Sequence, residues 1–183
     1  EKDIISFVAG PDNAMEFFRK IGEKKNQIHD VMIVGGSKIA FYLCKLLVAS
    51  GINVKLVDKK LERCEELSDL LPKVMVIHGN GMDHDLLMEE GLSDVDAFLA
   101  LTNHDEENIF LALYVQEQTD AKLVTKVQKI NYNAMIERLN LGSMIYPEYL
   151  TAQYLVQYVR AKQNSIGSNI ENLYKIMDGR AEA

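Results

Sequence analysis

The sequence predicts an α/β fold, a doubly wound parallel sheet with helices on both faces, and two observations lead to this prediction. Between residues 28 and 163, short apolar runs alternate with segments of helical periodicity, six of each. That alternation is typical of strands paired in parallel and connected by crossover helices. In addition, the first apolar run continues into two glycines and a helical segment, "VMIVGGSKIA" at residues 31–40, as expected where a buried strand turns into a helix.

Six strands are expected from short runs that are rich in apolar residues. They are residues 31–34, 53–57, 74–77, 96–101, 122–127 and 143–146. A helix is expected after each strand, at residues 37–50, 59–71, 83–90, from 105 onward, 132–140 and 148–163. The acidic residues 105–107 suit a first helical turn, because the helix dipole is positive there.

Residues that favour helix ends support these boundaries. Gly51 and Gly91 stand where helices are expected to end, since glycine accepts the backbone conformation of a C-terminal cap. Pro72 ends another helix, because proline lacks the amide hydrogen that a continuing helix needs. Asp83 can cap the helix that follows it, and Pro147 begins the last long helix.

The two ends of the chain are predicted to belong to other units. Residues 1–22 predict a strand and a short amphipathic helix, a unit too small to hold a core by itself. Residues 23–27 are polar and predict a linker, and residues 28–163 are expected to form the main domain. Residues 164–183 predict a linker followed by the opening strand of a truncated unit.

Composition and charge argue against several classes of protein. The 183 residues are 48% hydrophobic and 26% charged, which is the balance of a soluble globular protein. No apolar run approaches the ~18–20 residues that span a bilayer, and the charged start does not predict a signal peptide. Residues 74–121 hold eleven Asp or Glu and no Lys or Arg in a chain of net charge −7, so nucleic acid is not an expected partner.

The sequence predicts neither a metal site nor a catalytic site. Cys44 and Cys64 fall in expected helices without the spacing of metal ligands, and a reducing cytoplasm is the expected compartment. His78, His84 and His104 lack that spacing as well. No nucleophile–base pair is visible, and the segment after the last strand is too short for a substrate domain, so no enzymatic activity is predicted.

The turn after the first strand carries most of a dinucleotide-binding fingerprint, G-x-G-x-x-G/A. Gly35 is its first glycine, Ala40 takes the third place, and Ser37 stands where the middle glycine is usual. Backbone N–H groups and the positive end of the next helix favour a phosphate here. The Ser37 hydroxyl can crowd that phosphate or donate to it, and both possibilities stay open. Asp58 lies 23 residues after Gly35, close to the ~20 expected for the acid that binds ribose, so we predict a Rossmann-like nucleotide site.

Two further strand tips complete the predicted site, because the carboxyl ends of parallel strands share one edge of the sheet. After the third strand, Gly79 and Gly81 allow the backbone to approach a ligand closely. Between them, the Asn80 amide can bond the edge of an adenine ring. After the fourth strand, Thr102 and Asn103 are expected to line the other side.

Five segments together resemble a known family. They are "VMIVGGSKIAFYLCKLL", "VKLVD", "VIHGNGMDHDLLMEEGL", "DAFLALTNHDEENI" and "KLVTKV". They are similar to the nucleotide-binding domain of TrkA-type potassium uptake regulatory proteins, the RCK or KTN domain family. The resemblance covers residues 28–163, and its most specific pattern, A-L-T-N-x-D-E-x-N, runs from Ala100 to Asn108. Residues 1–22 and 164–183 resemble the end and the truncated start of the small regulatory domains that flank the second half of a tandem chain.

The resemblance implies a cytoplasmic regulatory subunit, peripheral to the inner face of the cell membrane, for a membrane potassium transporter of the TrkH or KtrB kind. It implies a homo-oligomer, at least a dimer, within an RCK ring that changes shape when NAD(H) or ATP/ADP binds. The residues that it implies for binding lie at four strand tips and on the fifth strand. They are Gly35, Gly36, Ser37, Lys38, Ile39, Ala40, Asp58, Lys59, Gly79, Asn80, Gly81, Met82, Leu101, Thr102, Asn103 and Lys126.

Two departures from the family pattern leave alternatives open, since Ser37 replaces a glycine and Asn80 replaces an aspartate. In the first alternative, the chain is an assembly module whose degenerate pocket binds no nucleotide. In the second, it is a fragment of an NAD-dependent oxidoreductase, which a hydride-transfer assay would reveal. The expected helix 148–163 has more apolar positions than one domain face needs, which favours packing on a partner subunit over a plain core helix.

Overall fold

A computed structural model describes residues 11–21, 27–128, 139, 141–164, 175–176 and 181–182. The chain divides into two compact units, of which one is Ile28–Thr151 and the other combines Glu1–Gln27 with Ala152–Ala183. The predicted strand near the N-terminus and the predicted helix 132–140 lie outside the described residues, apart from residue 139. In the second unit the structure describes helix α1, the later part of helix α7 and two short antiparallel strands. Their bounds are Pro11–Lys20 for α1, Pro147–Asn164 for α7, Lys175–Ile176 for β7 and Ala181–Glu182 for β8.

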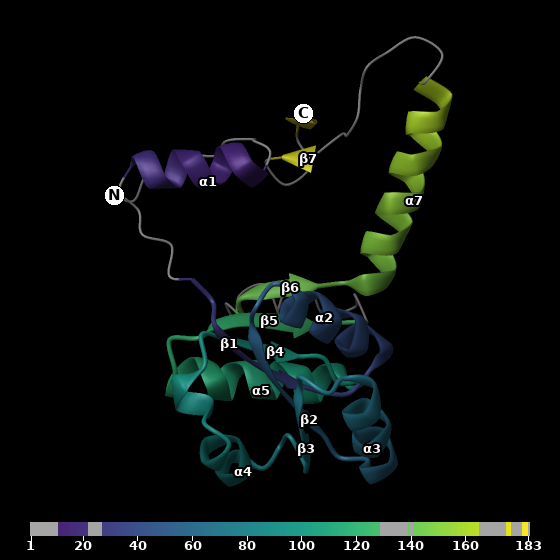
Figure 1. The fold of residues 1–183 in the computed structure, drawn as a ribbon. Helices are drawn as coiled ribbons and strands as arrows, with labels where there is room; N and C mark the ends of the chain where they lie inside the picture. Colours follow the sequence, from purple (N-terminus) through teal and green to yellow (C-terminus); the bar gives the residue numbers. More distant parts are fainter. Residues whose placement is uncertain are drawn as a thin grey trace. The chain divides into compact units, whose positions relative to one another are not determined.

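Six parallel strands form the sheet of the unit Ile28–Thr151, in the order β3-β2-β1-β4-β5-β6 (Figure 1). Their bounds are Asp30–Val34 for β1, Asn53–Asp58 for β2, Met75–His78 for β3, Ala97–Ala100 for β4, Lys122–Lys126 for β5 and Ser143–Ile145 for β6. This order reverses direction between β1 and β4, which makes the sheet doubly wound. The predicted Rossmann-like fold is therefore confirmed.

The helices of this unit follow the strands as predicted. Their bounds are Lys38–Ala49 for α2, Leu61–Leu70 for α3, His84–Glu89 for α4 and Asp105–Gln118 for α5. A short 3₁₀ helix, η1 at Leu92–Asp94, follows α4 and was not predicted. Asp83 caps α4 as expected, because its carboxylate accepts the N–H groups of Asp85 and Leu86.

The central strand β1 shows why a short apolar run suffices to position the site. Its side chains alternate between two apolar layers, so both of its faces are buried. Val31 and Ile33 pack in the layer that holds residues of α2 and α3. Met32 and Val34 pack in the opposite layer, with residues of α4 and α5 (Figure 1). The two layers hold the carboxyl end of β1, and the turn that follows it, in the middle of one sheet edge.

Candidate functional site

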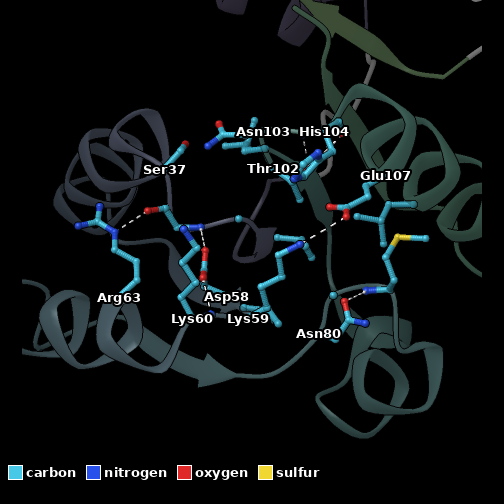
Figure 2. A pocket seen from close by; sticks show the side chains of 18 of the residues that line it. Ser37, Asp58, Lys59, Lys60, Arg63, Asn80, Thr102, Asn103, His104 and Glu107 are labelled. Carbon is cyan, nitrogen blue, oxygen red and sulfur yellow. Dashed lines mark hydrogen bonds and ion pairs between the residues drawn. The ribbon is translucent and has the colours of Figure 1, made fainter.

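A cavity of about 370 Å³ opens at the carboxyl edge of the sheet, where the order of the strands reverses (Figure 2). Loops after β1, β2, β3 and β4 surround it, together with the first turns of α2, α3 and α5. Its lining residues are Val34, Gly35, Gly36, Ser37, Lys38, Val57, Asp58, Lys59, Lys60, Arg63, Asn80, Gly81, Met82, Leu101, Thr102, Asn103, His104, Glu107 and Leu111. The four strand tips that the sequence singles out thus meet at one cavity.

Four of the predicted site residues lie outside this lining. Ile39 is 43% exposed on α2, while Ala40 is fully buried between α2 and the sheet. Gly79 lies directly against the side chain of Leu86, where a Cβ atom would collide with it. Lys126 is buried at the end of β5, behind the cavity residue that its ammonium group contacts. Their predicted part in binding stays a prediction.

The turn after β1 owes its shape to Gly35. This residue has a φ of +105°, and a Cβ atom here would lie 2.7 Å from the backbone nitrogen of Thr102. Ser37 has an ordinary φ of −68°, so its backbone does not require the glycine of the usual fingerprint. The Ser37 hydroxyl accepts the N–H of Ala40 and caps α2, at 3.3 Å. Its own hydrogen remains able to donate to an anion in the cavity.

The Asp58 carboxylate holds the loop after β1 against the start of α3. One oxygen accepts the N–H of Gly36 at 2.6 Å, and the other accepts the N–H of Lys60 at 2.8 Å. The carbonyl of Gly36 in turn accepts a hydrogen bond from Arg63 Nε at 2.6 Å, so the Gly36 residue is held on both sides (Figure 2). Each carboxylate oxygen retains a further lone pair for a ligand hydroxyl. Asp58 is therefore both a fixed structural element and an available acceptor.

Two asparagines line the cavity at the tips of β3 and β4, and they make different hydrogen bonds. At the β3 tip, the Asn80 side-chain oxygen accepts the N–H of Met82 at 3.1 Å, which leaves its NH₂ group available as a donor. At the β4 tip, the Asn103 oxygen accepts a hydrogen bond from Lys126 Nζ at 3.1 Å. Burial lowers the pKa of Lys126, and the carboxylate of Asp105 opposes this effect.

Asn108 explains why the pattern from Ala100 to Asn108 has its particular spacing. The Asn108 side chain is completely buried and bonds to Thr102, just after β4, and to Lys126, at the end of β5. Its oxygen accepts the N–H of Thr102 at 2.9 Å, and its NH₂ group donates to the carbonyls of Thr102 and Lys126 at 3.2 and 2.9 Å. One amide therefore joins the tips of β4 and β5 to α5.

Positive charge is in surplus around the cavity. Its basic side chains are Lys38, Lys59, Lys60 and Arg63, and its acidic ones are Asp58 and Glu107. This surplus contrasts with the net charge of −7 of the whole chain. Together with the first turn of α2, it favours a ligand that carries negative charge.

Sequence reasoning did not single out Arg63 and Glu107. Both lie on the first turns of helices, and the acidic residues at the start of α5 also suit the positive end of the helix dipole. The signal was present in the spacing, because His104, Glu107 and Leu111 recur at helical intervals and therefore share one face. All three line the cavity.

Among the described residues, the cysteines, the possible metal ligands and the helices differ from what a reactive thiol, a metal site or a membrane span requires. Burial raises the pKa of the Cys44 thiol to about 11, and it raises the pKa of Cys64 as well, so both thiols are poor nucleophiles at neutral pH. Within the described ranges, no three His, Cys, Asp or Glu side chains gather as metal ligands would. None of the described helices combines the length and apolarity needed to cross a bilayer.

The fold and the cavity define a Rossmann-like domain with a potential ligand site at its topological switch point. Residues 31–147 match the family model of the TrkA-N domain, and the chain belongs to that family. The Trk system potassium uptake protein TrkA of Haemophilus influenzae is 30% identical over 181 residues, which are 99% of this chain and 38% of that protein. The TrkA protein of Vibrio alginolyticus gives the same identity and the same coverage. The chain therefore spans about two fifths of the length of these relatives.

Solved structures share the fold at low sequence identity. The TrkA-N domain of the inner membrane protein ybaL from Escherichia coli superposes with a TM-score of 0.64 at 15% identity, over 74% of this chain and 99% of that chain. The GsuK channel bound to NAD superposes with a TM-score of 0.59 at 15% identity, over 91% of this chain and 30% of that chain.

Proposed function

We propose that the cavity binds an adenine nucleotide, NAD(H) or ATP/ADP, and that the chain is a regulatory rather than a catalytic part of a Trk-type potassium transport system. The observation that carries the proposal is the meeting of Asp58 with the turn of Gly36 and Ser37 at the switch point. There a ribose can bond to the carboxylate, while a phosphate lies at the first turn of α2. The surplus of basic side chains supports the negative charge of such a ligand.

The names of similar proteins support the biological setting of this proposal. The relatives are named as Trk system potassium uptake proteins, and a structure with the same fold is a channel bound to NAD. In this proposal the chain works in the cytoplasm at the inner face of the membrane, where an RCK ring controls a potassium transporter. The ligand acts through its different affinities for two shapes of the ring, and a coupling of about 1–3 kcal/mol is typical of such systems.

A homo-oligomer, at least a dimer, is part of the same proposal. Its support is the number of large apolar side chains that α7 exposes, more than one helix on a monomer surface usually carries. They are Tyr149, Leu150, Tyr154, Leu155, Val156, Tyr158 and Val159.

One observation favours a second candidate, an assembly module that binds no nucleotide. Ser37 lines the cavity at the place of the usual glycine, so its side chain occupies space beside the expected phosphate. Since the backbone of Ser37 is relaxed and its hydroxyl can donate, we prefer the binding role.

Thermal unfolding with NAD⁺, NADH, ATP and ADP in separate samples tests the two candidates. A ligand at a hundredfold its dissociation constant should stabilise the chain by roughly 2.7 kcal/mol, a shift of the unfolding midpoint by roughly 5–10 °C. The Asp58→Asn variant should lose most of this shift. The matched control is Asp96→Asn, since Asp96 also accepts two backbone N–H groups but lies outside the cavity lining.

The outcomes separate the candidates. A shift with one nucleotide that survives Asp96→Asn and disappears in Asp58→Asn supports the sensor. If none of the four nucleotides shifts the unfolding of the unmodified chain, the sensor proposal is wrong and the assembly module is preferred. Turnover of NADH with a carbonyl substrate would instead support the oxidoreductase.

A further inference from the structure

One ion pair crosses the cavity from one side to the other. Lys59 Nζ lies 3.5 Å from an oxygen of Glu107, although the two residues are 48 positions apart in the sequence. Lys59 follows β2, on the side of Asp58, whereas Glu107 belongs to α5, on the side of β4. Figure 2 shows Lys59 extending from the Asp58 side toward Glu107, which lies with Thr102 and His104 on the other side.

This pair is weak enough for a ligand to replace it. The Lys59 and Glu107 side chains are 53% and 32% exposed, and an ion pair with that exposure contributes only about 0–1 kcal/mol. Arg63 is engaged differently, since its Nε donates to the Gly36 carbonyl and its Nη1 contacts Glu66 at 2.6 Å. Compared with Arg63, Lys59 is therefore better suited to exchange its partner Glu107 for a charged group of a ligand.

Glu107 differs from the other acid of the cavity in what balances its charge. Both oxygens of Asp58 face backbone N–H groups, those of Gly36 and Lys60. Glu107 has Lys59 as its described ion-pair partner. When Lys59 turns to a bound phosphate, the carboxylate of Glu107 is left facing the cavity without compensation, and it repels negative charge placed near it.

The position of Glu107 determines which part of a ligand meets this charge. A ribose at Asp58 and a first phosphate at the start of α2 occupy the β2 side and the middle of the cavity. The rest of the ligand must extend toward β4 and α5, where Glu107 lies. In a nucleoside triphosphate that remainder consists of further phosphates. In a dinucleotide it is one further, singly charged phosphate followed by a second riboside, so less negative charge reaches Glu107.

We propose that Glu107 is a specificity-determining residue, which favours a dinucleotide over a nucleoside triphosphate, and that its ion pair with Lys59 opens when the ligand binds. This inference rests on the proposed function and adds the class of ligand to it. The Lys59–Glu107 pair then serves two purposes. In the empty cavity it neutralises both groups, and in the occupied cavity it is exchanged for a contact between Lys59 and phosphate.

Isothermal titration of the 183-residue chain with NAD⁺ and, separately, with ATP without divalent cations tests this role. Glu107→Gln keeps the shape of the side chain and removes its charge, so ATP should bind about fivefold more tightly while NAD⁺ changes less than about twofold. Lys59→Gln should weaken ATP more than NAD⁺, because it uncovers Glu107. The double variant should restore part of that loss.

The matched control is Glu106→Gln, one residue away on the same turn. Glu106 is exposed and lies outside the cavity lining, so neither affinity should change. The thermal unfolding of each variant without ligand shows whether it folds. High salt should reduce the difference between Glu107→Gln and the unmodified chain, which a purely steric role of Glu107 would not produce.

The results distinguish a failure of this inference from a failure of the proposed function. If the unmodified chain binds nucleotide but Glu107→Gln changes both affinities equally, or neither, Glu107 does not select the ligand, and the proposed function stands. Binding of ATP without binding of NAD⁺ would also overturn the inference. If the unmodified chain binds no nucleotide, both proposals are wrong.

Discussion

Two aspartates at opposite edges of the sheet use their carboxylates in similar ways, yet of the two only Asp58 lines the cavity described above. At the amino edge, one oxygen of Asp96 accepts the N–H groups of His29 and Asp30, at 2.7 and 3.0 Å. At the carboxyl edge, the two oxygens of Asp58 accept the N–H groups of Gly36 and Lys60. The hydrogen bonds of each carboxylate thus hold a loop against the end of a strand.

The difference lies in what surrounds each carboxylate. Helix α2 begins directly after the loop that Asp58 holds, so backbone N–H groups and the positive end of a helix dipole point at the same space. Parallel strands with crossover helices place these helix starts at the carboxyl edge and not at the amino edge. A carboxylate that accepts backbone N–H groups is therefore ordinary, and its position at the carboxyl edge of the sheet is what places Asp58 beside a candidate ligand site.

The largest effect is expected at the carboxyl edge, from Asn108→Leu. This substitution leaves the Thr102 N–H and the Lys126 carbonyl buried without their side-chain partner, and should lower the free energy of unfolding by about 3 kcal/mol. Urea unfolding followed by circular dichroism measures the loss. A change below about 0.5 kcal/mol would show that the β4 and β5 tips do not depend on this amide.

The second largest loss of stability is expected at the turn after β1. Gly35→Ala should destabilise the chain by about 2 kcal/mol or more, because it adds an unfavourable positive φ and a collision with the backbone of Thr102. Gly51→Ala is the control, since Gly51 has a φ of +78° and no atom within 4 Å of the added Cβ. It should cost only about 1 kcal/mol, the strain alone. Equal losses in urea unfolding would contradict a close approach of β4 to this turn.

A smaller effect is a pH dependence caused by Lys126. Burial lowers the pKa of Lys126 below 10.5, its ordinary value, so the unfolded chain binds more protons than the folded chain between the lowered pKa and 10.5. The free energy of unfolding should therefore rise with pH in that interval. Lys126→Met removes this contribution, and its stability relative to the unmodified chain should fall as the pH is raised from neutral. Parallel stability curves in chemical denaturation would contradict a desolvated ammonium group.

The smallest effect is expected at the amino edge of the sheet, where Asp96 contributes a pH dependence of stability. Hydrogen bonds from the backbone N–H groups of His29 and Asp30 lower the pKa of Asp96. The stabilisation is therefore complete above the ordinary carboxyl pKa of 3.8 and is lost as the pH falls through the lowered value. Asp96→Asn should flatten the acid limb of the thermal stability curve without changing any nucleotide response. If Asp96→Asn altered the response to nucleotide, the conclusion that only the carboxyl edge serves ligand binding would be wrong.

Much of the fold follows from local patterns in the sequence. The run Val31–Val34 predicts a strand buried on both faces, and Gly51, Pro72 and Gly91 stand just beyond helices that end in the structure near the expected residues. The strand tips also follow, since parallel strands must end at one edge. Among the predicted site residues, those next to a strand tip largely line the cavity, because their position depends on the strand alone.

The contacts that sequence patterns did not indicate are those between segments far apart in the chain. Lys126 ends β5, one residue before the expected end of that strand, and its ammonium group donates to Asn103 from outside the cavity lining. Arg63 reaches the carbonyl of Gly36 across 27 positions of sequence. Spacing along a helix indicates which side chains share a face, but not which loop that face meets.

The order of the described strands and helices, the doubly wound class and the sheet edge of the candidate site follow from the sequence. Apolar periodicity is a property of neighbouring residues, and alternating strands and helices favour parallel pairing with all strand ends at one edge. Only the tertiary structure decided that Asp58 fastens Gly36, that Asn108 joins two strand tips, and that Lys59 meets Glu107 across the cavity. These contacts join segments that are far apart in the chain. Their distances depend on how the apolar layers pack α2, α3 and α5 against the sheet, and no local pattern encodes that packing.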